Sequence, residues 1–231
     1  MLHNTFCRRL AALVLTLAVA VSAVLPVFAV YPMPIQTATE TEAVYLFNAD
    51  TGKTLLTQNA DQPRYVASLT KMMTALLVLE SGTDLNASIT IPDSLTPELQ
   101  SIRANRGHTI GLQAGETVRR IDMMYAMLLP SANDAASVLA VDTSGSLAAF
   151  AAQMNVRASQ LGCTATHFTC PHGLYDGGNY STARDMAKIA AAAFANKTLC
   201  EIDSTLSYKF PATKAAAART KLIFTKFFII N

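Results

Sequence analysis

The sequence predicts an α/β fold of the layered α+β kind, with strands placed before and after a cluster of helices. Two observations favour this class. Residues 42–61 form two apolar runs around a turn, which is typical of a β-hairpin, and residues 68–195 contain several segments with apolar residues at helical spacing. Strands followed by helices indicate a layered domain, and we expect a sheet only if further strands return after the helices.

The N-terminal residues 1–29 have the pattern of a secretory signal peptide. Arg8 and Arg9 precede an apolar run that ends at Leu25, and the small Ala29 follows at a cleavage-like site. A retained membrane anchor is the competing interpretation, but the run falls short of the roughly 20 residues that span a bilayer. We therefore expect cleavage after Ala29 and export from the cytosol.

The charge of the remaining chain gives no reason to expect nucleic acid as a partner. Loss of residues 1–29 removes two basic residues and no acidic residue from a total of 18 Lys and Arg and 16 Asp and Glu, so the charges balance. Residues 30–41 are rich in proline and threonine and are expected to form a linker. The folded part should begin at about residue 42.

The first folded elements are expected between residues 42 and 82. Asp50-Thr51-Gly52 marks the turn of the hairpin. From Ser68 to about Leu79 nearly every residue is apolar, so we expect a helix that is buried on all sides, with Gly82 at its C-terminal end. Residues 84–116 have few periodic signals and several turn formers, and are expected to be loops with short strands.

Four more helices are expected after this region. The first covers residues 116–129 and stops before Pro130, the second starts at residue 131, and the third covers residues 146–162. The fourth begins near Thr182, whose spacing to Asp185 fits a capping box. The end, "TKLIFTKFFIIN", is basic and β-prone, and residues 221–231 are interpreted as a divergent tail.

The cysteine and histidine residues of "CTATHFTCPHG" could be mistaken for a zinc site. Cys163, His167, Cys170 and His172 depart from the usual spacing of zinc ligands, and we expect no metal here. Beyond Cys7 in the leader, Cys163, Cys170 and Cys200 are an odd number, which is not a disulfide framework. Whether any of them pair is left open.

Ser68 and Lys71 are the first candidates for chemistry. Their i, i+3 spacing at the start of a helix puts both side chains on one face. A serine hydroxyl needs an adjacent base to act as a nucleophile, and a lysine can be that base only when it is neutral. Burial in an apolar helix favours the neutral amine, as does the positive end of the helix dipole. A helix N-cap with a solvated lysine is the simpler alternative.

Ser131 and Asn133 form a second candidate pair. The S-x-N triplet follows the expected helix break at Pro130, so it should lie on a turn, where side chains can converge on a site. The alternative is that Ser131 or Asn133 caps the next helix. Two such polar elements inside apolar helical sequence are harder to explain by capping alone.

The sequence resembles the serine D-alanyl-D-alanine carboxypeptidases, which are low-molecular-weight penicillin-binding proteins related to the serine β-lactamases. The resemblance covers about residues 40–220, in "YVASLTKMMTALLVLE", "GETVRRIDMMYAMLLPSANDAA", "HFTCPHGLYDGGNYSTARDMAKIA" and "FPATKAAAART". It implies a β-lactamase/DD-peptidase-like fold, with an antiparallel sheet packed against a helical cluster. It also implies a catalytic domain over residues 42–220.

The resemblance implies a role for each candidate residue. Ser68 is the nucleophile that attacks the peptide or β-lactam carbonyl, and Lys71 is the base that takes its proton. Ser131 relays a proton toward the leaving amine, and Asn133 binds the peptide group of the substrate. His172 belongs to a loop that shapes the fold. No cofactor and no metal are implied, and the partners are peptidoglycan stem peptides ending in D-Ala-D-Ala, with β-lactams as inhibitors.

One motif of the family does not occur. The family carries K-T-G or K-S-G on a strand beside the nucleophile, and no such triplet is present in this sequence. We therefore expect the catalytic domain to be incomplete, without its C-terminal strands and without the membrane anchor of the family. The alternatives that remain are a serine β-lactamase and a truncated fragment without activity.

Overall fold

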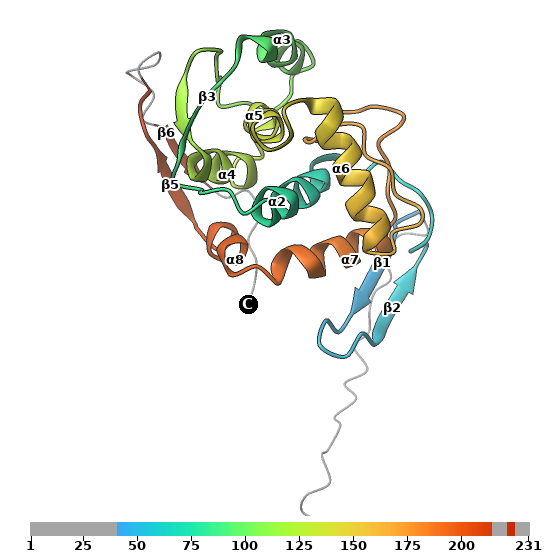
Figure 1. Cartoon of the computed structure of the whole chain (residues 1–231). Helices are drawn as coiled ribbons and strands as arrows, with labels where there is room; N and C mark the ends of the chain where they lie inside the picture. Colours follow the sequence, from blue (N-terminus) through green and yellow to red (C-terminus); the bar gives the residue numbers. More distant parts are fainter. Residues whose placement is uncertain (1–40, 214–220, 225–231) are drawn as a thin grey trace, which may run out of the picture. The chain divides into compact units, whose positions relative to one another are not determined.

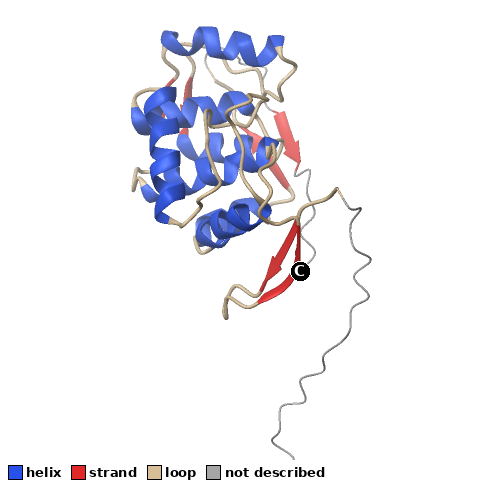
Figure 2. Cartoon of the chain, turned by 90° about the vertical axis from the view of Figure 1, so that its right-hand side faces the viewer, coloured by secondary structure: helices blue, strands red, loops and turns tan. Residues whose placement is uncertain are grey.

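The computed structural model describes residues 41–213 and 221–224. In this part of the chain, seven α-helices and six short strands alternate in the mixed arrangement that the sequence predicts. Figure 1 shows the helices gathered around α2, and Figure 2 shows the strands at the margin of the helical cluster. The expected leader, most of the expected linker and residues 225–231 lie outside the described residues.

The predicted hairpin is present near the start of the domain. Strands β1 (Val44–Phe47) and β2 (Thr54–Gln58) pair antiparallel, with Val44 opposite Gln58. Gly52 lies in the turn with φ of 69°, a conformation that glycine adopts without strain. The turn closes through a hydrogen bond from the backbone N–H of Gly52 to the carbonyl of Asn48. The local turn chemistry is thus enough to define this element.

Strands also return after the helices, but the described strands pair only two by two. Strand β3 (Ser88–Thr90) pairs with β4 (Thr117–Arg119), and β5 (Ser207–Phe210) pairs with β6 (Lys221–Phe224), both antiparallel. The expected single sheet is therefore seen as three separate pairs. Four residues that the sequence analysis placed in a divergent tail form β6.

Helix α2 (Thr70–Glu80) lies at the centre of the domain. A 3-10 turn, Ala67–Leu69, leads into it, and it packs against α4, α5, α6 and α7. The predicted burial on all sides is confirmed, because within α2 only Glu80 is exposed. A short turn follows, with Gly82 in the left-handed conformation at φ of 68°, as predicted for the end of this helix. A polar side chain on α2 therefore points into the interior.

The other predicted helices surround α2 (Figure 1). They are α4 (Arg120–Leu128), α5 (Asn133–Ser144), α6 (Leu147–Gln160) and α7 (Ala183–Phe194). Thr182 caps α7 by accepting a hydrogen bond from the backbone N–H of Asp185 at 3.1 Å. The Asp185 side chain bonds Ala165, Thr166 and Lys188 instead of completing a capping box.

Two helices were missed. The expectation of loops and short strands for residues 84–116 was wrong in part, because α3 (Thr96–Ala104) lies there. Pro97 reads as a turn former, but it occupies the first turn of α3, where the missing N–H leaves no hydrogen bond unmade. Helix α8 (Lys197–Asp203) has only seven residues and begins at the Asn196 cap, so its periodicity was too short to detect.

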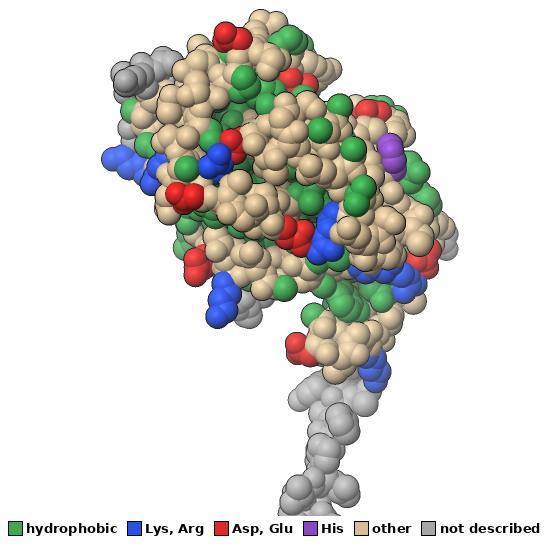
Figure 3. Space-filling view, in the orientation of Figure 1, with side chains coloured by type: hydrophobic (Ala, Val, Ile, Leu, Met, Phe, Trp, Pro, Cys, Tyr) green, Lys and Arg blue, Asp and Glu red, His purple; other side chains and the backbone are tan. Residues whose placement is uncertain are grey.

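On the face of the molecule drawn in Figure 3, acidic and basic side chains are interspersed. Within the described residues, no single helix has the length and apolar character needed to cross a membrane; α5 and α6 reach it only when taken together, and they are bent by 84°.

Candidate functional site

Ser68 and Lys71 lie together at the start of α2. Ser68 belongs to the 3-10 turn and is exposed, whereas Lys71 is one helical turn further on and only 3% exposed. The Nζ atom of Lys71 lies 3.2 Å from Oγ of Ser68. An exposed hydroxyl in contact with a buried amine has the geometry of a nucleophile beside a base.

Lys71 also contacts two segments that are far away in the sequence. Its Nζ donates to Oδ1 of Asn133 at 2.6 Å and to the backbone carbonyl of His172 at 2.9 Å. Asn133 is the first residue of α5 and is 4% exposed, and His172 lies in the loop before α7. Helix α2, the start of α5 and the loop before α7 thus hold the Lys71 amine in one position. Ser68 lies on the solvent-exposed side of this amine.

Ser131 lies two residues before Asn133 and makes no side-chain hydrogen bond to Ser68 or Lys71. It is 6% exposed, and its Oγ has no hydrogen-bond partner among the described residues. Its backbone is left-handed, with φ of 61°. A buried hydroxyl without a partner and a non-glycine residue in this conformation are both costly, and such features concentrate at functional sites. The structure thus brings Ser68, Lys71 and Asn133 together, with Ser131 unbonded.

The backbone beside Ser68 is strained and tightly packed. Ala67 has φ of 47°, which is unusual for a residue with a side chain. Gly173, with φ of 76°, lies against it, and a Cβ atom at Gly173 would be 1.9 Å from the Ala67 carbonyl oxygen. Only glycine fits at position 173, so the turn of Ser68 and the loop of His172 are fixed against each other.

The same loop is attached to α2 at two further points. Oγ1 of Thr74 donates to the carbonyl of Pro171 at 2.6 Å, and the side chain of Asn179 donates to Oγ1 of Thr70 at 3.1 Å. Thr70, Lys71 and Thr74 lie on adjacent turns of α2, and all are buried. Buried threonines in an apolar helix are a sequence signal for this contact, and Thr70 and Thr74 were not among the predicted site residues.

Asp134 fixes the other wall of the site. Its buried carboxylate accepts backbone N–H groups of Ile110, Gly111 and Leu112 and bonds the Thr109 hydroxyl. The loop that it holds also carries the carbonyl of His108, which accepts from the backbone N–H of Asn133 at 2.8 Å. Asp134 therefore holds the start of α5 against this loop.

We expect Asp134→Ala to lower the free energy of unfolding by about 3 kcal/mol, because several buried backbone donors lose their acceptor. Denaturant titration followed by circular dichroism measures the change. Asp142→Ala is the matched control, since Asp142 forms a partly exposed ion pair with Arg120 at 2.5 Å and should lose only about 1 kcal/mol. Equal losses in the two variants would contradict the role given to Asp134.

Glu98 is a site residue that the sequence analysis missed, because it lies on the unpredicted helix α3. Its Oε1 contacts Nε2 of His172 at 2.9 Å and accepts from the hydroxyl of Ser137 at 3.1 Å. The hydrogen bond to His172 lowers the pKa of Glu98, and burial opposes this effect. For His172, burial favours the neutral ring, but the side chains of Cys170 and Glu98 outweigh it and raise the pKa.

These two pKa shifts predict a pH dependence of stability. A raised pKa of His172 contributes stability below the ordinary value of about 6.5, and the contribution is lost as pH rises through the pKa of the folded state. A lowered pKa of Glu98 contributes above about 4.3 and is lost as pH falls. We expect the stability lost in Glu98→Gln to be largest near pH 5.5 and smaller at pH 8.5, measured by denaturant titration. A loss independent of pH would contradict the charged pair.

The residues considered for zinc have other contacts. The His167 ring contacts the carbonyl of Gly178 at 2.7 Å, and Cys163 is buried with its thiol directed at the carbonyl of Asp185. Within the described part of the chain, no three His, Cys, Asp or Glu side chains are placed to hold a metal ion. None of Cys163, Cys170 and Cys200 is in a disulfide.

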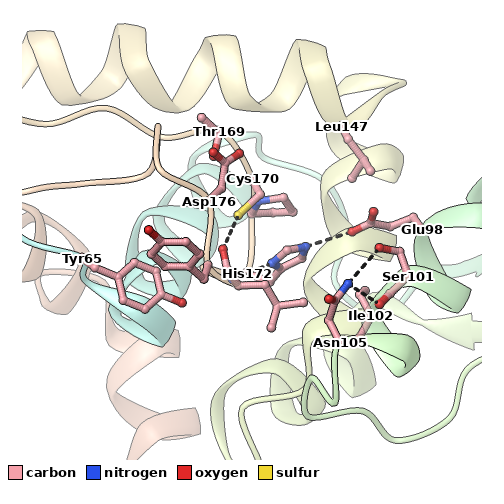
Figure 4. Close-up of a pocket in the computed structure, with 13 residues that line it drawn as sticks. Tyr65, Glu98, Ser101, Ile102, Asn105, Leu147, Thr169, Cys170, His172 and Asp176 are labelled. Atoms are coloured by element: carbon pink, nitrogen blue, oxygen red, sulfur yellow. Dashed lines mark hydrogen bonds and ion pairs between the residues drawn. The ribbon is translucent and has the colours of Figure 1, made fainter.

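Ser68, Lys71, Asn133 and the His172 carbonyl are called the Ser68 group. A cavity of about 550 Å³ lies next to the Ser68 group and shares His172 with it. His172 contributes its imidazole to the cavity wall and its carbonyl to Lys71. Figure 4 shows that Tyr65, Glu98, Asn105 and Cys170 also face this space. Ser68, Lys71, Ser131 and Asn133 are not part of its lining, so the cavity is beside the site and not at its centre.

Comparison with known proteins gives consistent matches. The chain is 38% identical over 184 residues to a D-alanyl-D-alanine carboxypeptidase of Streptomyces sp. strain K15, covering 76% of this chain and 62% of that protein. It is 36% identical over 160 residues to the D-alanyl-D-alanine carboxypeptidase DacA of Escherichia coli, covering 66% of this chain and 39% of that protein. The chain thus spans less than two thirds of these relatives.

The solved structures agree with the sequence matches. The crystal structure of the Streptomyces K15 DD-transpeptidase superposes with a TM-score of 0.71 at 35% identity, over 78% of this chain and 71% of that one. A D-alanyl-D-alanine carboxypeptidase of Mycobacterium tuberculosis superposes with a TM-score of 0.68 at 28% identity, over 79% and 65%. Residues 31–226 match the family described as D-alanyl-D-alanine carboxypeptidase, and the chain belongs to that family.

Proposed function

We propose that this protein is a serine-type D-Ala-D-Ala carboxypeptidase that removes the terminal D-alanine of peptidoglycan stem peptides through an acyl-enzyme on Ser68. The observation that carries the proposal is the position of the Lys71 amine, buried and 3.2 Å from the Ser68 hydroxyl. A serine beside a buried lysine can be activated without a histidine. The family and the named functions of the relatives support the same reaction.

The contacts of Lys71 suit a base. A neutral amine has two N–H donors and one lone pair. The oxygens of Asn133 and His172 would accept the two N–H groups, which would direct the lone pair at the Ser68 hydroxyl. Lys71 would then take the proton as Ser68 Oγ attacks the carbonyl carbon, and the bond to the D-alanine amine would break.

The remaining candidates act on the substrate. The backbone N–H of Ser68, at the start of the helix, would stabilise the oxyanion as half of an oxyanion hole. Ser131 would pass a proton toward the leaving amine, and its unpartnered Oγ leaves it available for that bond. Asn133 would bind the peptide group of the substrate through its side-chain amide. Water would then hydrolyse the acyl-enzyme and restore Ser68.

The same site should react with β-lactams, which also present a carbonyl to Ser68. The proposal includes export: residues 1–29 as a leader, residues 30–41 as a linker and residues 42–220 as the catalytic domain. This organisation would place the enzyme outside the cytosol, where cell-wall peptides are found. The Streptomyces and Escherichia coli relatives carry the carboxypeptidase name, which supports the assignment of residues 42–220 as a catalytic domain.

Fluorescent penicillin tests the proposal directly. We expect the purified chain to form a stoichiometric adduct that peptide mapping locates on Ser68, and to release D-alanine from a peptide ending in D-Ala-D-Ala. The adduct should form slowly, because the sequence has no K-T-G triplet and one missing oxyanion donor costs roughly 10²–10³ in rate.

Other outcomes would identify the alternatives. Fast repeated turnover of a chromogenic cephalosporin, without D-alanine release, would identify a β-lactamase instead. A folded chain that forms no adduct on Ser68 would contradict the proposal and support an inactive fragment.

A further inference from the structure

Cys170 lies in the wall of the cavity beside the Ser68 group. Its side chain is part-buried and lines the space of about 550 Å³, which is large enough for a small organic molecule (Figure 4). The cavity is also polar at this point, with Glu98 and His172 on its wall. The thiol is therefore accessible to a reagent that enters the cavity.

The surroundings of Cys170 resemble those of a reactive thiol. The backbone N–H of Gly173 donates to its Sγ at 3.3 Å, and the His172 ring, which contacts Glu98 at 2.9 Å, is adjacent. Burial alone would raise the pKa of the Cys170 thiol, but hydrogen bonding and charge from His172, with the backbone donor of Gly173, lower it. The ring itself is held at both nitrogens, because Nδ1 accepts from the backbone N–H of Leu174 at 3.0 Å and Nε2 contacts Glu98. The backbone donor of Gly173 and the neighbouring His172 side chain thus favour the thiolate of Cys170.

The other described cysteines are different. Cys163 is 5% exposed, and burial raises the pKa of its thiol to about 11. Cys200 is exposed on α8, and its thiol donates to the carbonyl of Phe194 at 3.2 Å. The described part of the chain therefore contains one buried thiol and one exposed thiol for comparison with Cys170.

The loop that carries Cys170 is hydrogen-bonded to Lys71. Between Cys170 and Gly173 the loop bonds α2 twice, through the Pro171 carbonyl to Thr74 and through the His172 carbonyl to Lys71. Gly173 is packed against Ala67 with no room for a Cβ atom. A group attached to Cys170 therefore lies in the cavity, against the loop whose His172 carbonyl holds the Lys71 amine.

We infer that Cys170 is a site of reversible modification by small organic disulfides, and that the adduct fills the cavity and moves the loop of residues 170–174 away from Lys71. The Cys170 thiolate attacks one sulfur of the disulfide, and a new S–S bond forms at Cys170. The S–S bond of the reagent breaks, and its electron pair leaves with the second sulfur as a thiolate. The proton of the Cys170 thiol passes to water, and no further oxidant is needed.

The first test measures the exchange itself and does not depend on activity. Three full-length chains are prepared in which serine replaces every cysteine except Cys170, Cys163 or Cys200, and each reacts with a dipyridyl disulfide whose released thiopyridone is followed by absorbance. We expect exchange at Cys170 and Cys200 and none at Cys163 until the chain is denatured. Because the Cys170 thiolate persists to lower pH, the ratio of the Cys170 rate to the Cys200 rate should rise between pH 8 and pH 6. A constant or falling ratio would overturn the inference.

The second test measures the effect on the site. In the chain that retains Cys170, the adduct should increase amide hydrogen exchange at residues 170–174, and dithiothreitol should reverse the increase. Unchanged exchange would overturn the displacement of the loop. This readout remains decisive if the chain forms no acyl-enzyme, which would contradict the proposed function separately.

The consequence for catalysis rests on the proposed function. The adduct should slow labelling of Ser68 by fluorescent penicillin by about tenfold to a hundredfold, the cost of a displaced catalytic group. The chain that retains only Cys200 should keep its labelling rate after the same treatment, because Cys200 lies on α8 and does not contact the site. Labelling of Ser68 at an unchanged rate in the Cys170 adduct would overturn the inhibitory effect.

Discussion

Ser68→Ala is expected to abolish covalent labelling by penicillin and to lower D-alanine release by about five to six orders of magnitude, the scale on which a serine peptidase depends on its nucleophile. The substitution removes the only atom of the side chain that can form the acyl bond. Ser68 is exposed and its Oγ contacts the Lys71 amine at 3.2 Å, so the free energy of unfolding should change by less than about 0.5 kcal/mol. Gel fluorescence and a D-alanine assay measure the two activities.

Ser94→Ala is the matched control for this variant. Ser94 is also exposed and also lies in a short 3-10 turn, Asp93–Leu95, but on a different part of the domain. Fluorescent penicillin should label the Ser94→Ala variant at the wild-type rate. Thermal melts of both variants should overlay the wild type, which separates loss of chemistry from loss of fold. Labelling that survives Ser68→Ala would mean that another residue carries the acyl group.

The sequence was most informative where the contact is local. Ser68 and Lys71 are three residues apart, so helical geometry alone puts their side chains on one face, and the apolar neighbours of Lys71 predict its burial. The hairpin before residue 61 and the central helices were also predictable, because turn chemistry and apolar periodicity define them within short windows.

Contacts made by tertiary packing were not predictable from those patterns. Asn133 was found through its motif, but its contact with Lys71 spans 62 positions, and no spacing rule gives it. Glu98 was missed because its helix has only two buried apolar residues, Leu99 and Ile102, too few for a periodic signal. The His172 carbonyl is a backbone group, and its role depends on a fold that only the structure shows.

Lys71→Met is the second substitution with a large expected effect. Removal of a general base lowers a rate by about 10²–10⁴, and acylation of Ser68 should fall by that factor. Methionine is of similar length and is apolar, so it fits the buried position, but the oxygens of Asn133 and His172 lose their donor. We expect the free energy of unfolding to fall by about 1–3 kcal/mol for that reason. Stopped-flow acylation and denaturant titration measure the two quantities.

Lys71→Arg distinguishes a base from a hydrogen-bond donor. A guanidinium keeps N–H donors at this position, but it stays protonated near neutral pH, so it cannot accept a proton from Ser68. Its acylation rate should be as low as that of Lys71→Met, even where its stability is closer to the wild type. Lys188→Met is the control, because Lys188 on α7 is more exposed and bonds Asp185, away from Ser68. Acylation within tenfold of the wild type in Lys71→Arg would show that the lysine positions the site and does not take the proton.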